Sequence, residues 1–192
     1  MQTVLFFPGF QENEETRDYS KTIKAIELGG YKVIFVDINW VRTTMEDWLA
    51  TAKKEYSKYN SQEVVLAGFS FGAMIAFCLA VDTNPSELWL FSLSPYFYED
   101  IHSKHMKKSW LSAIGHRRVL AFDKLYFSKM SKEIMCKTKV FAGSKELEKW
   151  PGFNHRFLEA GKMVANSESF VIEGVEHDVA DDKYVQIIRD NI

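Results

Sequence analysis

Cysteine is scarce in this sequence. The 192 residues contain two cysteines, Cys78 and Cys136, which lie far apart and match no metal-ligand spacing. This scarcity excludes a disulfide-rich scaffold and a cysteine-bound metal centre. Cys78 falls within an apolar helical pattern, so we expect a buried, reduced thiol there.

Long apolar runs are also missing. The N-terminal stretch MQTVLFFPGF has no basic n-region, and its apolar run is too short for a signal peptide or a membrane span. It is typical of a β-strand instead. With no export signal and no disulfide pattern, we expect a cytoplasmic protein without a membrane span.

Net charge is small, at -2, and gives no reason to expect a polyanionic partner such as nucleic acid. Basic residues do cluster at Lys104, Lys107, Lys108, Arg117 and Arg118, but no recognised nucleic-acid-binding module surrounds them. We interpret the cluster as a solvated face. Oligomeric state does not follow from the sequence.

Length and composition indicate one globular domain. The chain is 46% apolar and 26% charged, and it shows no internal repeat and no low-complexity segment. We therefore expect a single domain over residues 1–192.

Apolar segments alternate with helical patterns along the chain. Six segments are predicted to be strands: 3–9, 31–39, 63–68, 87–95, 137–143 and 169–174. Helices are predicted over 14–28, 45–59 (with Thr44 as N-cap), 70–82, 153–165 and 178–192. Apolar strands that alternate with helices predict an α/β fold, a three-layer sandwich around a mainly parallel sheet. Residues 96–131 show no strand pattern, so we expect short helices over one edge of the sheet.

The stretch GFSFG, residues 68–72, stands between a predicted strand and an apolar helix. It matches G-x-S-x-G in the context that a catalytic nucleophile turn requires. The turn is tight, and side chains larger than hydrogen on either flank would collide with the strand and the helix. The sequence therefore resembles the α/β-hydrolase superfamily, with Ser70 as the implied nucleophile.

In that superfamily the chain order is serine, acid, histidine. His177 follows the last predicted strand, where the family keeps its base; the other reading is a polar loop residue before a helix cap at Asp178. For the acid, Glu146 reproduces the family's G-x-x-D spacing from Gly143 with Glu in place of Asp. Glu148 is the second candidate, and Asp37 and Glu99 are further candidates. The other reading of Glu146 and Glu148 is that they are two solvated carboxylates beside Lys145 and Lys149.

The resemblance also implies an oxyanion hole made by two backbone N–H groups. These belong to Phe71, after the nucleophile, and to Phe10, in the loop after the first strand. Gln11 is an alternative donor. Family members often carry His-Gly in that loop, whereas this chain has Pro8-Gly9.

Two features differ from a full-length member of the superfamily. The chain begins at what corresponds to the third strand, so we expect about six strands, and the lid-like insertion at 96–131 is short. The aromatic residues of the insertion either line an acyl pocket or pack the insertion onto the sheet. For the substrate pocket we name Phe69, Gln11, Tyr96 and Phe97.

The resemblance implies a serine hydrolase that cleaves a carboxylic ester or thioester of a small molecule through an acyl-enzyme on Ser70. No metal or organic cofactor is implied, since the sequence has no phosphate-binding glycine-rich loop and no metal-ligand spacing. Two alternatives remain open: a non-catalytic binding or accessory protein on the same fold, and a hydrolase of carbon–carbon or other acyl bonds.

Overall fold

The six predicted strands form a single parallel sheet. The computed structural model describes residues 1–149 and 155–192. In spatial order the sheet is β2-β1-β3-β4-β5-β6, and all of its pairings are parallel. The strands are β1 (Thr3–Phe7), β2 (Lys32–Phe35), β3 (Val64–Phe69), β4 (Glu87–Phe91), β5 (Lys137–Gly143) and β6 (Ser167–Ile172). The expected strand number is confirmed.

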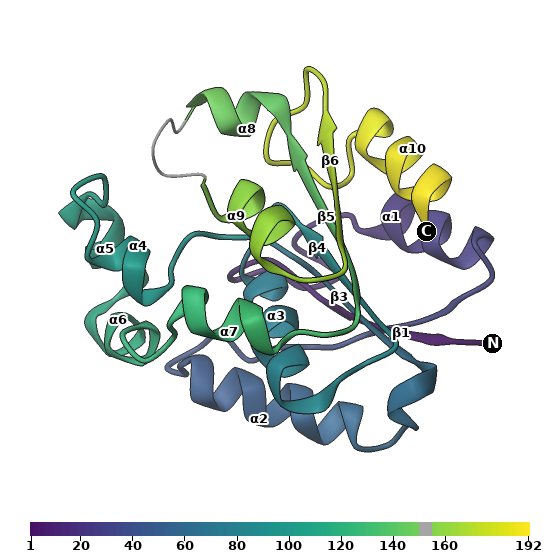
Figure 1. Cartoon of the computed structure of the whole chain (residues 1–192), viewed down its shortest axis with the longest axis horizontal. Coiled ribbons are helices and arrows are strands. Elements are labelled where there is room, and N and C mark those ends of the chain that lie inside the picture. The colour runs from purple at the N-terminus through teal and green to yellow at the C-terminus, as the bar shows by residue number, and fades with distance from the viewer. Residues whose placement is uncertain (150–154) are drawn as a thin grey trace.

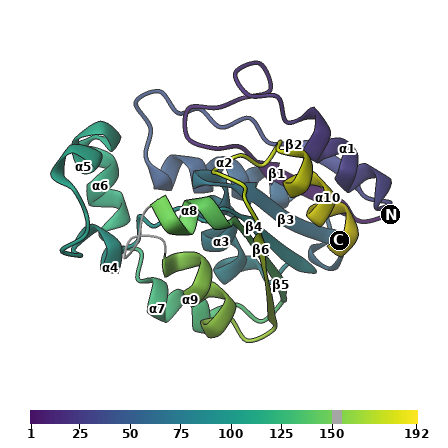
Figure 2. The same ribbon diagram turned by 90° about the horizontal axis from the view of Figure 1, so that it is seen from above.

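Helices cover both faces of this sheet (Figures 1 and 2). They are α1 (Ser20–Leu28), α2 (Met45–Tyr56), α3 (Phe71–Thr83), α4 (Tyr98–Ile101), α5 (Lys108–Ile114), α6 (His116–Phe122), α7 (Phe127–Glu133), α8 (Ser144–Lys149), α9 (His155–Met163) and α10 (Asp182–Asn191), with a 3₁₀ turn at Ser61–Glu63. Helices α1 and α10 pack together on one face, and α2, α3 and α9 lie on the other. The three-layer α/β sandwich is confirmed.

Successive side chains of the central strands point to opposite faces of the sheet, so these strands contribute to a hydrophobic core on each face. Leu66 of β3 faces the α2–α3 layer, whereas Val65 and Ala67 face the α1–α10 layer. Because both faces are covered at the centre of the sheet, every residue of β1 and β3 is buried, which is why these strands appear in the sequence as continuous apolar runs. Helix α3 is buried almost all round, as its composition predicts.

Two predicted helices begin later than expected. The first begins at Ser20 and not at residue 14. Side chains before it bond nearby amides instead: Asn13 accepts from the Thr16 N–H and Asp18 from the Ser20 N–H, which competes with helical hydrogen bonding. The last helix begins at Asp182, because Asp181 and not Asp178 caps it.

Some element boundaries also differ. Strands β2 and β4 end at Phe35 and Phe91, short of the predicted residues 39 and 95, since the chain there leaves the sheet to form loops at its carboxyl edge. Helix α8 was not predicted. Thr44 is the N-cap of α2 as expected, and its N–H donates to the Asp47 carboxylate at 2.9 Å.

The aromatic segment after β4 forms four short helices, α4 to α7. Helix α6 packs against α2, and α7 packs against α3 and α9; the side chains of Phe122 and Phe127 are fully buried there. Within the described residues no helix is long and apolar enough to cross a membrane.

Candidate active site

Ser70 lies on a strained turn between β3 and α3. Its backbone has φ 58° and ψ -115°, which is rare for a residue with a side chain and costs on the order of 1–3 kcal/mol. The surroundings hold it there: the Ser70 N–H donates to the Phe91 carbonyl at 2.9 Å, and the Ser70 carbonyl accepts from the Met74 N–H at 3.3 Å. The turn therefore places the hydroxyl at the carboxyl edge of the sheet.

The two glycines of GFSFG are required by close approach. A Cβ on Gly68 would collide with the backbone of Gly72, and a Cβ on Gly72 would collide with the carbonyl of Phe7 at the end of β1. Both obstacles are main-chain atoms, which cannot move aside as a flexible side chain can. The structure therefore has the lack of space at Gly68 and Gly72 that the motif predicts.

Glu146 and His177 meet beside this turn. His177 Nδ1 lies 2.6 Å from Glu146 Oε2, and because a carboxylate only accepts, the Nδ1 atom carries the hydrogen. The carboxyl group is 3% exposed, and its Oε1 accepts from the Gly143 N–H at 2.8 Å and from Ser92 Oγ at 2.7 Å. Glu146 is thus fixed by three hydrogen bonds.

Helix α8 and the loop of His177 are also joined through the backbone. We call residues 173–181, between β6 and α10, the histidine loop. The Gly174 N–H donates to Ser144 Oγ at 2.9 Å, and the Lys145 N–H donates to the Val175 carbonyl at 3.1 Å. These bonds set the separation of Glu146 and His177 independently of their own contact.

Ser92 and Tyr184 extend the network behind Glu146. Ser92, with φ 50°, gives its single hydroxyl hydrogen to Glu146, so the Tyr184 hydroxyl at 3.1 Å must donate to Ser92. Burial, together with the Glu146 carboxylate, raises the pKa of Tyr184 well above its usual range, which keeps this donor protonated. Sequence reasoning missed both residues, although Ser92 directly follows β4 at the edge where α/β sites form.

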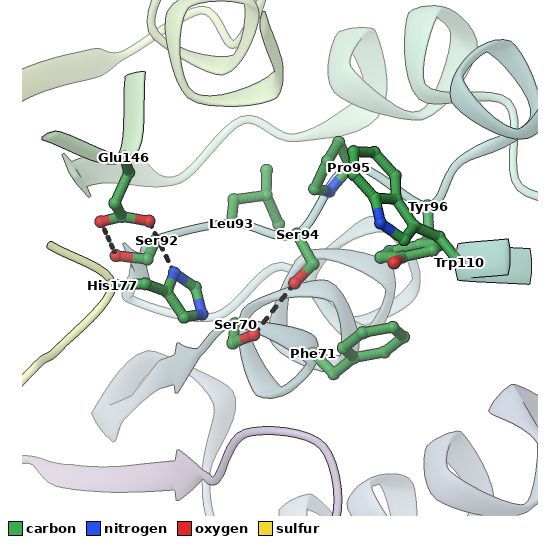
Figure 3. Close-up of a pocket in the computed structure, with 10 residues that line it drawn as sticks. All are labelled: Ser70, Phe71, Ser92, Leu93, Ser94, Pro95, Tyr96, Trp110, Glu146 and His177. Carbon is green, nitrogen blue, oxygen red and sulfur yellow. Dashed lines mark hydrogen bonds and ion pairs between the residues drawn. The ribbon is translucent and has the colours of Figure 1, made fainter. Parts of the chain in front are cut away.

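Ser94, also missed, contacts the serine of the turn. Ser70 Oγ lies 3.0 Å from Ser94 Oγ. Figure 3 shows the imidazole of His177 between Glu146 on one side and Ser70 on the other. The side chains of Ser70, Glu146 and His177 therefore come together at the carboxyl edge of the sheet. Ser94, from the loop after β4, lies beside Ser70.

These residues open onto a cavity of about 260 Å³. Its described lining consists of Ser70, Phe71, Ser92, Leu93, Ser94, Pro95, Tyr96, Trp110, Glu146 and His177 (Figure 3). Apolar side chains form the wall opposite the glutamate, and none of the described lining residues is Lys or Arg. A cavity with this lining suits an uncharged ligand group.

Of the four residues named for the substrate pocket, only Tyr96 is among the described lining residues. Phe97 is fully buried against the rings of Phe77 and Phe127. Phe69 is buried beneath the imidazole of His177, with ring centroids 4.7 Å apart. Gln11 lines a different hollow, beside Trp40 and Arg118.

The other candidate acids have other positions. Glu148 is exposed on α8. Glu99 accepts from the N–H groups of Phe127 and Ser128 at the start of α7, and Asp37 borders the same hollow as Gln11. None of the three carboxylates is among the described residues that line the cavity with His177.

The two residues expected to supply the oxyanion hole are neighbours. Phe71 is the first residue of α3, so its N–H has no acceptor within the helix and lies at the positive end of the helix dipole. Phe10 follows β1, and its ring packs on the Phe71 ring with centroids 5.1 Å apart. This ring contact brings the loop after β1 next to the start of α3, the helix that directly follows Ser70.

No protein-family model and no curated protein matches this sequence. Solved structures do match. Est1E from Butyrivibrio proteoclasticus, described with bound ferulic acid, is 13% identical with a TM-score of 0.75, over 99% of this chain and 86% of that one. MGS-MChE2, an α/β-hydrolase enzyme from a lagoon-sediment metagenome, is 14% identical with a TM-score of 0.70, over 98% and 89%. The thioesterase domain of the curacin biosynthetic pathway is 14% identical with a TM-score of 0.68, over 97% and 89%. The chain therefore has the α/β-hydrolase fold.

Proposed function

We propose that this protein is a serine hydrolase that cleaves a carboxylic ester or thioester of a small molecule. Ser70 is the nucleophile, His177 the general base, and Glu146 the acid that orients the imidazole. The backbone N–H groups of Phe10 and Phe71 bind the oxyanion.

The observation that carries this proposal is the contact between His177 Nδ1 and Glu146 at 2.6 Å, at a cavity that Ser70 also lines. Because Nδ1 carries the ring hydrogen toward the carboxylate, Nε2 is the basic nitrogen of the neutral imidazole and can take the proton of the hydroxyl. The strained backbone of Ser70 supports the same conclusion, because strain of this kind is retained where a site needs it.

The proposed reaction has two steps. In the first, the Ser70 oxygen bonds to the acyl carbon as its proton passes to His177; the bond to the leaving group then breaks, and the imidazolium returns that proton to the leaving oxygen or sulfur. In the second, His177 takes a proton from water, whose oxygen attacks the acyl-enzyme, and Ser70 is released with its proton restored. Glu146 stabilises the imidazolium in both steps.

The contact between Ser70 and Ser94 is compatible with the proposed attack. Ser70 Oγ lies 3.0 Å from Ser94 Oγ, and a hydroxyl can accept one hydrogen bond while it donates its own hydrogen to another group. Ser94 is a neutral hydroxyl, so it adds no charge to the cavity.

The cavity favours a small, uncharged acyl group. Its volume of about 260 Å³ is below the usual range for ligand pockets, and Leu93, Tyr96 and Trp110 give it an apolar wall. A carboxylate on the acyl group would meet Glu146, and none of the described lining residues is a Lys or Arg that could balance it. We further propose that residues 96–131 act as a lid, since Trp110 of α5 is part of this wall.

A substrate panel tests the reaction class. We expect hydrolysis of p-nitrophenyl esters and acyl thioesters of short chains, and a loss of about 10³-fold or more in kcat for Ser70→Ala. Cleavage of a carbon–carbon bond between two carbonyl groups without ester or thioester turnover would favour the alternative reaction. A binding or accessory protein would leave Ser70 unreactive toward a fluorophosphonate.

We also propose a cytoplasmic location. Cys78 and Cys136 are both free, and a reducing compartment keeps cysteines in this state.

A further inference from the structure

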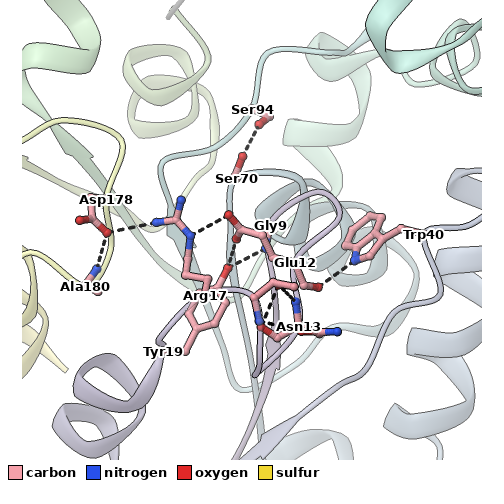
Figure 4. A network of polar contacts seen from close by, with 11 residues as sticks. Gly9, Glu12, Asn13, Arg17, Tyr19, Trp40, Ser70, Ser94, Asp178 and Ala180 are labelled. Carbon is pink, nitrogen blue, oxygen red and sulfur yellow. Dashed lines mark hydrogen bonds and ion pairs between the residues drawn. The ribbon is translucent and has the colours of Figure 1, made fainter.

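A network of charged side chains lies in the segment between β1 and α1, which we call the first-strand loop (residues 8–19). The Glu12 carboxylate accepts from the Tyr19 hydroxyl and, at 2.6 Å, from Arg17 Nε (Figure 4). Tyr19 in turn accepts from the Gly9 N–H at 2.9 Å. A Cβ on Gly9 would collide with the Glu12 carboxylate, so this negative charge lies directly against the backbone that precedes Phe10.

Arg17 also reaches the histidine loop. Its Nη1 lies 3.1 Å from Asp178 Oδ1, next to the proposed base (Figure 4). Its guanidinium carbon lies 5.0 Å from the centre of the Phe69 ring, and that ring packs beneath His177. The Arg17 and Glu12 side chains are 27% and 20% exposed, so solvent screens their pairing only in part. One cation thus connects the first-strand loop to the histidine loop.

The position of Glu12 makes this cation necessary. An unpaired carboxylate beside the first-strand loop would oppose the negative charge that develops on the substrate oxygen during attack. The Glu12 carboxylate still has a structural role, because it accepts from the Tyr19 hydroxyl, and that hydroxyl in turn accepts from the Gly9 N–H. Burial raises the pKa of Tyr19, so this hydroxyl stays protonated and donates to Glu12.

We propose that Arg17 is a positioning residue of the hydrolytic site, which neutralises Glu12 beside the proposed oxyanion hole and holds the histidine loop through Asp178. The inference rests on the proposed function, because it assigns roles relative to Ser70 and His177. It adds Arg17, from the first-strand loop, to the roles proposed for Ser70, His177 and Glu146.

Arg17 also belongs to the charge balance around His177. The anionic groups at the histidine loop are Glu146 of α8 and Glu173, Glu176, Asp178 and Asp181 of the loop itself; the cationic groups are Arg17, Lys145, Lys149 and Lys183. Removing Arg17 takes away the cation that pairs with Glu12 and Asp178, and the negative charge left near His177 favours the protonated imidazole. The same substitution therefore acts on the oxyanion and on the base.

The first experiment follows the imidazole without any substrate. The His177 C2–H resonance is titrated by NMR in the wild type, Arg17→Met, Arg17→Lys and Lys21→Met. Lys21 of α1 pairs with Asp182 of α10 at 2.6 Å on the exposed surface, and these two helices directly follow the two loops, so Lys21 is the matched control. We expect a higher titration midpoint for Arg17→Met, and the wild-type midpoint for Arg17→Lys and Lys21→Met. An unchanged midpoint in Arg17→Met would overturn the proposal.

The second experiment measures kcat/KM on a p-nitrophenyl ester at a pH above every titration midpoint that the first experiment measures. We expect Arg17→Met to lose about 10- to 100-fold, and Arg17→Met/Glu12→Gln to recover most of that loss, because Gln keeps an acceptor for Tyr19 without the charge. A double variant as slow as or slower than Arg17→Met overturns the proposal. If the wild type itself shows no turnover, the proposed function fails, and the NMR titration still decides whether Arg17 acts on His177.

Discussion

His177 Nδ1 lies 2.6 Å from a carboxylate oxygen of Glu146, although the two residues are 31 positions apart in sequence. Helix α8 brings the carboxylate over the end of β5, and the histidine loop returns beside it after β6. The pair is therefore a product of two neighbouring parallel strands that end at the same edge of the sheet, and it explains why the acid follows β5 in the chain.

Glu146→Gln should reduce kcat by about 10²- to 10⁴-fold with little loss of stability, because the amide keeps the shape but no longer favours the imidazolium or the correct tautomer. Steady-state kinetics on a p-nitrophenyl ester measures this. Glu148→Gln is the matched control, since Glu148 is exposed two residues away. Near-full turnover in Glu146→Gln together with a collapse in Glu148→Gln would show that the acid is assigned to the wrong residue.

Ser92 offers a test of the bond behind the acid. Both Ser92→Ala and Ser92→Gly remove the hydroxyl that donates to Glu146 at 2.7 Å, so both should lower kcat/KM by roughly 3- to 10-fold. Only glycine relieves the positive φ of this position, so Ser92→Gly should be more stable than Ser92→Ala by about 1 kcal/mol. Denaturant unfolding checks the second point. Equal activity in the wild type and both variants would show that the Ser92 hydroxyl does not assist Glu146.

Gly72→Ala tests the close approach at the turn. A Cβ there meets the Phe7 carbonyl, so we expect a loss of about 3 kcal/mol or more in unfolding free energy, or no folded protein. Gly30→Ala is the control: its φ is +89° but nothing lies within 4 Å of the added atom, so conformational strain alone should cost about 1 kcal/mol. Similar losses in the two variants would mean that the contact with Phe7 is not decisive.

Trp110→Ala should change the preferred acyl chain. Trp110 is part of the apolar wall of a cavity of about 260 Å³, and removal of the indole enlarges the space for the acyl group. We expect the optimum in kcat/KM across a p-nitrophenyl ester series to move to longer chains, with a smaller shift for Trp110→Phe. An unchanged chain-length profile would indicate that the acyl group occupies a different hollow.

Much of the fold could be predicted because a parallel sheet covered on both faces needs apolar strands, and these are visible in the sequence. GFSFG predicted the turn because its glycines are imposed by backbone contacts that any such turn must make. The start of α1 could not be predicted from apolar spacing, since Asn13 and Asp18 bond neighbouring amides and outweigh the helical pattern of the same stretch.

The described lining of the cavity was harder to predict for a different reason. Tyr96 and Phe97 are adjacent and both aromatic, yet Tyr96 lines the cavity and Phe97 is buried among Phe77 and Phe127. Which of them faces the site depends on the path of the chain after β4 and not on residue type. Ser92 and Ser94 carry no pattern of their own, and only their place after a central strand gives them partners.

The central claim is that Ser70 is an activated nucleophile. The most direct measurement is covalent labelling by a fluorophosphonate, with the modified residue located by tandem mass spectrometry of the digested protein. We expect one adduct on Ser70 in the wild type, none in Ser70→Ala, and much slower labelling in His177→Ala at equal folding. Folded wild-type protein that takes up no label, or a label that persists in Ser70→Ala, would contradict it.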